Sequence, residues 1–470
     1  MTGRGSARPL RMLVLTAVLL LSTRAYADIK LDEFAWQVRP VLSGPELTVS
    51  SDEGSFLLHY TAEGDDTPTG IDDEDGNGLP QVVDRVLDGL SVGLEAYRER
   101  GFRELLPDDG SGGSSAIDVY IMGINANGFA NADTAADPSA GHSCYMRLDK
   151  DLIAQGDQIL ESVVIHELHH CIQFVYTVDA DPWLYEAAST YEQYQHIRTD
   201  VLDLAATTLW YFRLDRPDLP LGSEGERYEY AGMIFMKFWE ELGGVDHSRG
   251  PQLWESLAAE PVWRRALDAE SRRQWGLDFD SLFLEFSTWN LFACGNDDGA
   301  HYGADVLPCA APANPIPVTE IDWTDPIIGV EEQRITHTAA YYSLPGAGDT
   351  SPVSLACSAL DPGTQALVRL VAIDRNGRAI AEASITGGSD EQFRVRLDHQ
   401  IDGQGSVAVV VASTGALPAD FNCRAKRVDP IDQDQGATCR HTPPSQSAAA
   451  GLILLALLLY RRSTNSPVFP

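Results

Sequence analysis

Residues 161–171 read ESVVIHELHHC and contain an H-E-x-x-H motif. In a helix, His166 and His170 lie four positions apart, so both imidazole rings project from one face and can bind one metal ion. Neutral imidazole is a preferred ligand of zinc. Glu167 lies beside the pair, where its carboxylate can take a proton from a water that the metal activates. Apolar residues recur at helical spacing on both sides of the motif, which predicts a helix packed on its other face.

A second helix is predicted a short distance downstream. Asp181 is a suitable N-cap and Pro182 a suitable first helical residue, which places Glu186 in the second turn. A catalytic zinc site uses three protein ligands and leaves the fourth position to water. We therefore select Glu186 as the third zinc ligand and Glu192 as its alternative, although a solvated helix carboxylate is the simpler interpretation of Glu192. The motif alone is also compatible with a helix that carries histidines by chance.

The composition indicates an exported protein of more than one domain. A chain of 470 residues can hold two or more domains, and a formal net charge of -35 argues against nucleic acid as a partner. Residues 1–27 read as a secretory signal peptide, with a basic region, an apolar run and an Ala-Tyr-Ala cleavage site. Seven cysteines fit an oxidising compartment. The pairs that we consider are Cys144–Cys171, Cys294–Cys309 and Cys357–Cys423.

Residues 73–84 have the oxygen-ligand spacing of an EF-hand-type calcium loop. They read D-x-D-x-N-G and end on an acidic residue at the twelfth position. The simpler interpretation is an ordinary acidic surface turn. A structural calcium ion would fix the start of an amphipathic helix predicted over residues 82–100. The expected ligands are the side chains of Asp73, Asp75, Asn77 and Asp84 and the carbonyl of Leu79.

Two further features concern a substrate cleft. Residues 115–122 alternate like a strand, and we expect this strand to be an edge strand beside the cleft, whereas residues 123–143 read as a loop. The segment 226–239 is predicted as an aromatic helix. Its Tyr230, or Tyr228, could donate a hydrogen bond to an oxyanion that develops during hydrolysis. A core or rim tyrosine is an equally good interpretation of either residue.

The C-terminal part of the sequence has a different pattern. Residues 326–428 alternate with period two and carry the hairpin signal Asn376-Gly377, which predicts a small β-sandwich. Residues 429–447 read as a linker. Residues 448–470 contain an apolar run followed by two arginines, with Cys439 just ahead of it. This arrangement predicts a sorting segment cut by a sorting protease, and the alternative is a plain membrane anchor.

Together these features resemble a known family. The signal peptide, the D-x-D-x-N-G loop, the H-E-x-x-H motif, the Trp183-x-x-Glu186 helix and the C-terminal tail are similar to secreted metalloproteases of myxobacteria and related delta-proteobacteria, with a tail of the MYXO-CTERM type. The zinc part resembles the gluzincins. This resemblance implies His166, His170 and Glu186 as zinc ligands and Glu167 as general base.

The implied fold class is α+β. A lead-in segment at residues 28–68 would precede a zincin-like catalytic domain at residues 69–325, with a strand-edged cleft, the H-E-x-x-H helix and a helical second subdomain. The β-sandwich would follow it. The sequence differs from thermolysin-like enzymes in its shorter distance between the second histidine and the glutamate.

We therefore expect an exported zinc metalloendopeptidase that acts on proteins or peptides as a monomer. It would be attached to the cell surface or outer membrane through its C-terminal segment, or secreted after that segment is processed. The alternative is a non-catalytic surface-binding protein with a structural or lost metal site. A fourth ligand from His142, His169 or Cys171 would favour that alternative. A zinc hydrolase with another substrate class is a third interpretation, because the cleft and not the metal sets the substrate.

Overall fold

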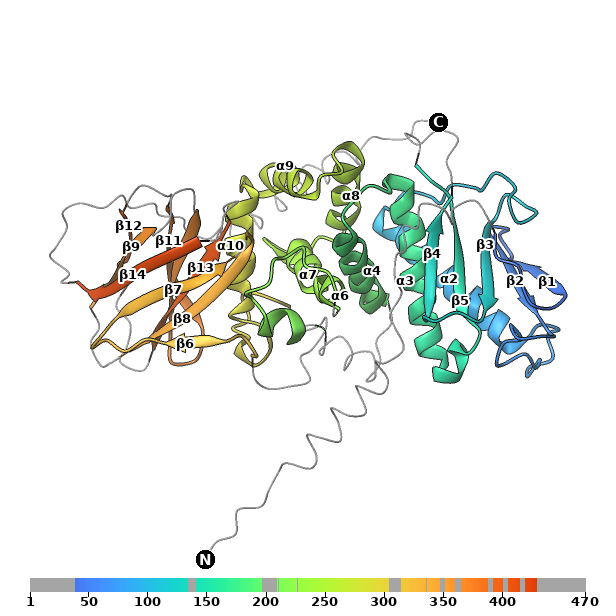
Figure 1. Ribbon diagram of the computed structural model, residues 1–470, viewed down its shortest axis with the longest axis horizontal. Coiled ribbons are helices and arrows are strands. Elements are labelled where there is room, and N and C mark those ends of the chain that lie inside the picture. The colour runs from blue at the N-terminus through green and yellow to red at the C-terminus, as the bar shows by residue number, and fades with distance from the viewer. Residues whose placement is uncertain are drawn as a thin grey trace, which may run out of the picture.

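The computed structural model describes residues 39–133, 141–196, 209, 211–225, 227–303, 314–334, 336–346, 351–359, 365–387, 392–399, 405–414 and 419–428. The predicted signal peptide, the linker 429–447, Cys439 and the segment 448–470 lie outside these residues. The described chain is a mixed α and β structure, as expected. Figure 1 shows a sheet at one end, helices in the middle and an all-β region at the other end.

The N-terminal sheet has five strands in the order β1-β2-β3-β5-β4. Strands β2, β3 and β5 run parallel, whereas β1 and β4 are antiparallel to their neighbours at the two edges. Both β1 and β2 come from the segment predicted as a lead-in. The strands span Glu46–Ser50 (β1), Phe56–Thr61 (β2), Ile117–Met122 (β3), Gly128–Ala132 (β4) and Cys144–Asp149 (β5).

The position of the edge strand corrects the sequence interpretation. Strand β3, which we expected at an edge, lies in the centre of the sheet, and β4 forms the edge from residues that read as a loop. Five of the six β3 residues are buried, which fits a strand covered on both faces. Strand β4 has the sequence GFANA, whose small residues give almost no strand signal.

Two helices of 20 residues accompany this sheet. Helix α3 (Asp157–Tyr176) packs on β4 and β5, and helix α2 (Gln81–Arg100) packs on α3. The close approach of the two helices depends on Gly93 in α2, because a Cβ atom there would lie 3.0 Å from Leu168. The helix predicted at residues 82–100 is therefore confirmed, and it supports the helix that carries the H-E-x-x-H motif.

A helical region follows and is filled with aromatic side chains, among them the fully buried Trp183, Trp239 and Trp254. Helix α10 begins where the Asp278 side chain accepts a hydrogen bond from Ser281 N. In the described part of the chain, we find no helix with the length and apolar character needed to cross a lipid bilayer. The helices are α4 (Pro182–His196), α6 (Tyr228–Ala231), α7 (Met233–Glu241), α8 (Arg249–Ala259), α9 (Trp263–Trp275) and α10 (Phe279–Asn290), with 3-10 turns at Leu152–Gln155 and Cys294–Asn296.

The C-terminal region consists of two sheets that share one apolar core, as expected for a β-sandwich. One sheet has the order β11-β10-β13-β8-β6 and the other β12-β9-β14-β7. Cys357 and Cys423 lie opposite each other on β9 and β14 and form the expected disulfide. The strands are β6 (Val318–Glu320), β7 (Ile327–Arg334), β8 (Thr338–Pro345), β9 (Val353–Ala359), β10 (Ala366–Ile373), β11 (Ala379–Gly387), β12 (Gln392–Leu397), β13 (Ser406–Ser413) and β14 (Ala419–Arg427).

A buried histidine ties the first strands to the centre of the sheet. The ring of His59 contacts Glu46 through Nδ1 at 2.5 Å and Asp118 through Nε2 at 3.1 Å. Arg39 also pairs with Asp118, at 2.7 Å, and with Asp133, which follows β4. Burial lowers the pKa of His59, but the hydrogen bonds to Asp118 and Glu46 outweigh it, and the pKa is raised overall.

Candidate metal centre

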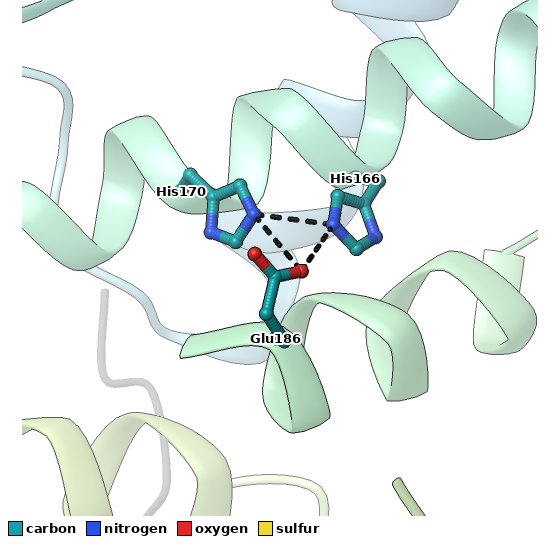
Figure 2. Close-up of side chains that lie close together, drawn as sticks. All are labelled: His166, His170 and Glu186. Atoms are coloured by element: carbon teal, nitrogen blue, oxygen red, sulfur yellow. Dashed lines mark hydrogen bonds and ion pairs between the residues drawn. The ribbon is translucent and has the colours of Figure 1, made fainter. Parts of the chain in front are cut away.

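Helices α3 and α4 together build the candidate site. Helix α3 is held against the sheet by the disulfide between Cys144 in β5 and Cys171, which confirms that predicted pair. Helix α4 begins at Pro182, as the sequence predicts, and carries Glu186 in its second turn. Because α3 and α4 pack against each other, Glu186 faces the two motif histidines (Figure 2).

The three expected zinc ligands converge on one point. His166 Nε2 lies 3.1 Å from His170 Nε2 and 3.2 Å from Glu186 Oε2, and His170 Nε2 lies 3.7 Å from the same oxygen. The ligand atoms are all within 4.8 Å of one another. The side chains are almost fully buried, with exposures of 3% for His166, 1% for His170 and 4% for Glu186. The H-E-x-x-H helix and the downstream helix thus bring two nitrogen atoms and one oxygen atom close enough together to bind one metal ion.

The hydrogen bonds of the histidines indicate which nitrogen atoms are available to a metal. Nδ1 of His166 lies 3.2 Å from Gln193 Oε1, and Nδ1 of His170 lies 2.8 Å from Gln173 Oε1. An amide oxygen only accepts, so each Nδ1 carries the proton and each Nε2 presents a lone pair. Both lone pairs face Glu186, whose Oε1 has no hydrogen-bond partner in the described chain. A cation can bind all three of these lone-pair atoms. Two imidazoles and one carboxylate are a ligand set that fits zinc.

The electrostatics keep the carboxylate ligand ionised. Burial raises the pKa of Glu186, but the neighbouring His170 and His166 outweigh it and lower this pKa to about 2. An ionised carboxylate is the form that binds a metal.

Glu167 is the most unusual side chain of the region. It is fully buried and forms no ion pair or side-chain hydrogen bond with the described residues, and its hydrogen-bonding neighbour is the backbone of Ala130 in β4. It lies against the edge strand β4, because a Cβ atom on Gly128 would come within 2.7 Å of Glu167 Oε1. Burial raises the pKa of Glu167 to about 8, although His170 acts in the opposite direction. Glu167 therefore lies beside His166, His170 and Glu186 but does not belong to this converging group.

The alternative third ligand, Glu192, is wrong, and so is the expectation that it is solvated. Its exposure is 2%, and it pairs with Arg100 at 3.0 Å. Arg100 also pairs with Glu240, so Glu192 belongs to a separate buried ion cluster. Glu192 lies six residues after Glu186, and the helix turns it away from the histidines.

The residues considered as a fourth ligand have other partners. Cys171 is in the disulfide with Cys144. His142 binds the carbonyl of Asp133 through Nδ1 at 2.7 Å. His169 lies 3.0 Å from Ser189 Oγ through Nδ1, and its ring packs among aromatic rings. Those rings belong to Tyr97, Phe102 and Trp254.

Tyr230 lies close to the site and Tyr228 is in the same short helix. The ring centroids of Tyr230 and His166 are 6.2 Å apart. Both tyrosines are buried. The ring of Tyr230 therefore lies beside that of His166, and its role as a hydrogen-bond donor stays a prediction.

The calcium-type loop folds around its own side chains. Asp73 accepts hydrogen bonds from the backbone of Gly76 and Gly78, and Asn77 donates to Asp84 Oδ2 at 2.9 Å. The left-handed conformations at Gly76 and Gly78, with φ of 78° and 97°, require glycine. Helix α2 begins at Gln81, within the last four residues of the loop, so Asp84 lies in its first turn. Calcium binding here stays a prediction.

Sequence reasoning missed Gln173 and Gln193, the hydrogen-bond partners of the metal-site histidines. Gln173 is three residues after His170 on α3, and Gln193 is seven residues after Glu186 on α4. Spacings of three and seven residues correspond to about one and two helical turns, so Gln173 lies on the same helix face as His170, and Gln193 on the same face as Glu186. A search for amides or carboxylates at those positions could have found them.

No family model matches the chain, and no curated protein matches it. Solved structures with partial similarity include the surface-associated copper-binding protein CorA of Methylomicrobium album BG8, at 12% identity over 24% of this chain and 98% of that chain, with a TM-score of 0.17. A Clostridium thermocellum endo-1,4-beta-D-xylanase, in a fragment with a carbohydrate-binding module, shares 12% identity over 23% and 26%, with a TM-score of 0.16. A carbohydrate-binding module in complex with calcium and xylotriose shares 17% identity over 21% and 87%, with a TM-score of 0.15. Similarities this small carry no conclusion about function.

Proposed function

We propose that this protein is an exported zinc-dependent metalloendopeptidase with a zincin-like catalytic domain. The observation that carries the proposal is the convergence of His166, His170 and Glu186 beside a buried carboxylate, Glu167, that forms no ion pair with a described residue. Two disulfides support an exported protein. Attachment to the cell surface or outer membrane, or secretion after C-terminal processing, is part of this proposal.

His166, His170 and Glu186 would hold the zinc ion. When bound there, zinc supplies Lewis acidity toward water and toward a carbonyl oxygen. Glu167 would take the proton of the attacking water and pass it to the leaving amine. Gln173 and Gln193 keep the two imidazoles in the tautomer that exposes Nε2.

Strand β4 suggests how a peptide would bind. It is the last strand of the sheet and lies against Glu167 at Gly128. An extended peptide can add to a free strand edge through main-chain hydrogen bonds. Such a peptide would bring its backbone carbonyls past the catalytic carboxylate. Tyr230, near His166, would donate a hydrogen bond to the developing oxyanion.

The second candidate function is a non-catalytic surface-binding protein with a structural metal. The near-complete burial of the site favours it, because a peptide must reach the metal to be hydrolysed. A closed structural zinc site has four protein ligands, however, and three converge among the described residues. The two functions therefore differ in whether a position of the metal is open to water.

The test is elemental analysis of the purified protein followed by hydrolysis of an unfolded protein such as casein. We expect about one zinc per wild-type chain, from the single three-ligand site, and much less in Glu186→Ala. Glu161→Ala is the matched control, since Glu161 is on α3, the helix of the two histidines, but outside the converging group. Zinc without hydrolysis would support the binding protein, and a folded wild type that takes up no zinc would reject both metal-based functions.

Calcium at residues 73–84 is a separate part of the proposal. Calcium would replace the hydrogen bonds that now hold the loop and fix the start of α2. The wild type should melt at a higher temperature with calcium than with a chelator, and Asp75→Ala should remove that difference. An identical response in both proteins would show that the loop is an ordinary turn.

A further inference from the structure

A small cavity lies where the helical region meets the β-sandwich. It is enclosed by α10, by β8 and by the chain around residues 213–217. Its volume is about 10 Å³, measured for the centre of a water-sized sphere. A space of this size holds one water molecule or one ion of similar size. Its polar lining includes Arg213, Ser287, Asn290 and Tyr341, and the rings of Phe283 and Phe286 also line it.

Arg213 is a buried cation that forms no ion pair with any residue of the described chain. Its exposure is 4%, and its Nη1 donates to the carbonyls of Leu219 and Pro220 at 3.1 Å each. Asp215, two residues further along the chain, is exposed, and Asp218 is paired with Arg216 on the surface. Arg249, the other buried arginine of the described chain, likewise donates to backbone carbonyls, those of Glu240 and Leu242, but it also pairs with Asp246 at 3.8 Å.

The cavity wall adds no negative charge, and its hydroxyl groups already have acceptors, since Ser287 Oγ donates to the Phe283 carbonyl at 2.8 Å. None of the described residues that line it is Asp or Glu. Tyr341 donates its hydroxyl hydrogen to the Ser287 carbonyl at 3.0 Å. Asn290 Oδ1 accepts from Tyr302 at 2.7 Å, which leaves the Asn290 NH2 group as a further donor.

A buried charge without a counter-charge is costly. Burial lowers the pKa of Arg213 to about 10, so the guanidinium still carries its charge at neutral pH. Neutralisation by proton loss is therefore not available under ordinary conditions, and an anion beside the guanidinium would offset the cost.

We propose that this cavity is a binding site for a monatomic anion of the size of chloride, held by the guanidinium of Arg213. The anion would neutralise the one buried arginine at the junction and so stabilise the contact between α10 and the sandwich. This inference is independent of the proposed peptidase, because the site shares no residue with the metal centre.

The test compares thermal unfolding of the full metal-free chain in sodium chloride, bromide and fluoride at equal ionic strength. Specific binding should raise the melting temperature by about 2 °C for each tenfold increase in chloride or bromide above the dissociation constant. General salt effects follow the opposite order, since strongly hydrated ions stabilise proteins best. Arg213→Met should lose the response. Arg216→Met should keep it, because Arg216 is exposed and paired with Asp218.

A second measurement does not depend on the stability of the Arg213 variant. The chloride NMR line of a dilute salt solution should broaden on addition of metal-free wild type, and bromide should reverse the broadening by competition. Equal melting temperatures in all three wild-type salts, or no excess broadening relative to Arg213→Met, would overturn the proposal.

Discussion

The hydrogen bond between Gln193 and His166 provides a direct test of how the metal ligands are held. Replacing Gln193 by leucine removes the acceptor 3.2 Å from His166 Nδ1 and keeps a side chain of similar size. Both side chains are buried, with exposures of 4% and 3%, so water does not replace the lost partner. A buried N–H left without an acceptor costs about 1–3 kcal/mol. The zinc-bound form requires that N–H, whereas the metal-free ring can reorient, so the cost appears as weaker binding. Zinc affinity should fall about 10- to 100-fold.

The assay is competition for zinc against a chromophoric chelator, with circular dichroism to verify the fold. Gln193→Glu is the matched control, because it keeps an acceptor at the same place and should bind zinc at least as tightly as wild type. Gln193 also donates to Ser162 Oγ at 3.1 Å, and that contact is lost in both variants, so it does not separate them. A leucine variant with an affinity within about twofold of wild type would refute the role of this hydrogen bond.

Three further predictions concern catalysis, pH and the disulfide. Glu167→Gln should keep zinc and become more stable to urea. Its rate of peptide hydrolysis should fall about 10²–10⁴-fold, so an active zinc-loaded variant would contradict the assignment of Glu167 as general base. The pKa of His59 is raised in the folded protein. The stabilisation that protonated His59 gives to the fold is therefore complete below the unfolded pKa of about 6.5 and disappears as pH rises through the folded pKa. The urea midpoint should fall over that window in wild type and less in His59→Gln. The double change Cys144→Ser and Cys171→Ser opens a loop with a separation of 27 residues and should lower the free energy of unfolding by about 3.5 kcal/mol in denaturant titrations.

Local rules were sufficient to predict which three side chains converge at the candidate site. The four-residue spacing of His166 and His170 fixes their common face once the segment is helical. The start of α4 at Pro182 follows from helix-capping preferences, and this start sets the position of Glu186. The Cys144–Cys171 pair was predicted as well, and it adds a covalent link between α3 and the sheet.

The features that sequence could not predict depend on contacts between distant segments. Glu192 looks like a surface residue of α4 until Arg100, from the end of α2, is placed beside it. Strand β4 has little intrinsic strand preference and forms because β5 pairs with it. Arg213 likewise has no sequence signal, since its burial arises only when the sandwich packs on α10.

The environment of Glu167 bears on the choice between a catalytic and a structural metal. A fully buried carboxyl group is costly to ionise, which raises the pKa of Glu167 to about 8, and a glutamine of the same shape would avoid that cost. A structural site would gain nothing from the charge, because the metal already has His166, His170 and Glu186 and Glu167 is outside that group. A hydrolytic site needs a carboxylate that accepts a proton and is not itself bound to the metal. The cost of burying Glu167 beside β4 is therefore easier to explain for an enzyme than for a closed structural centre.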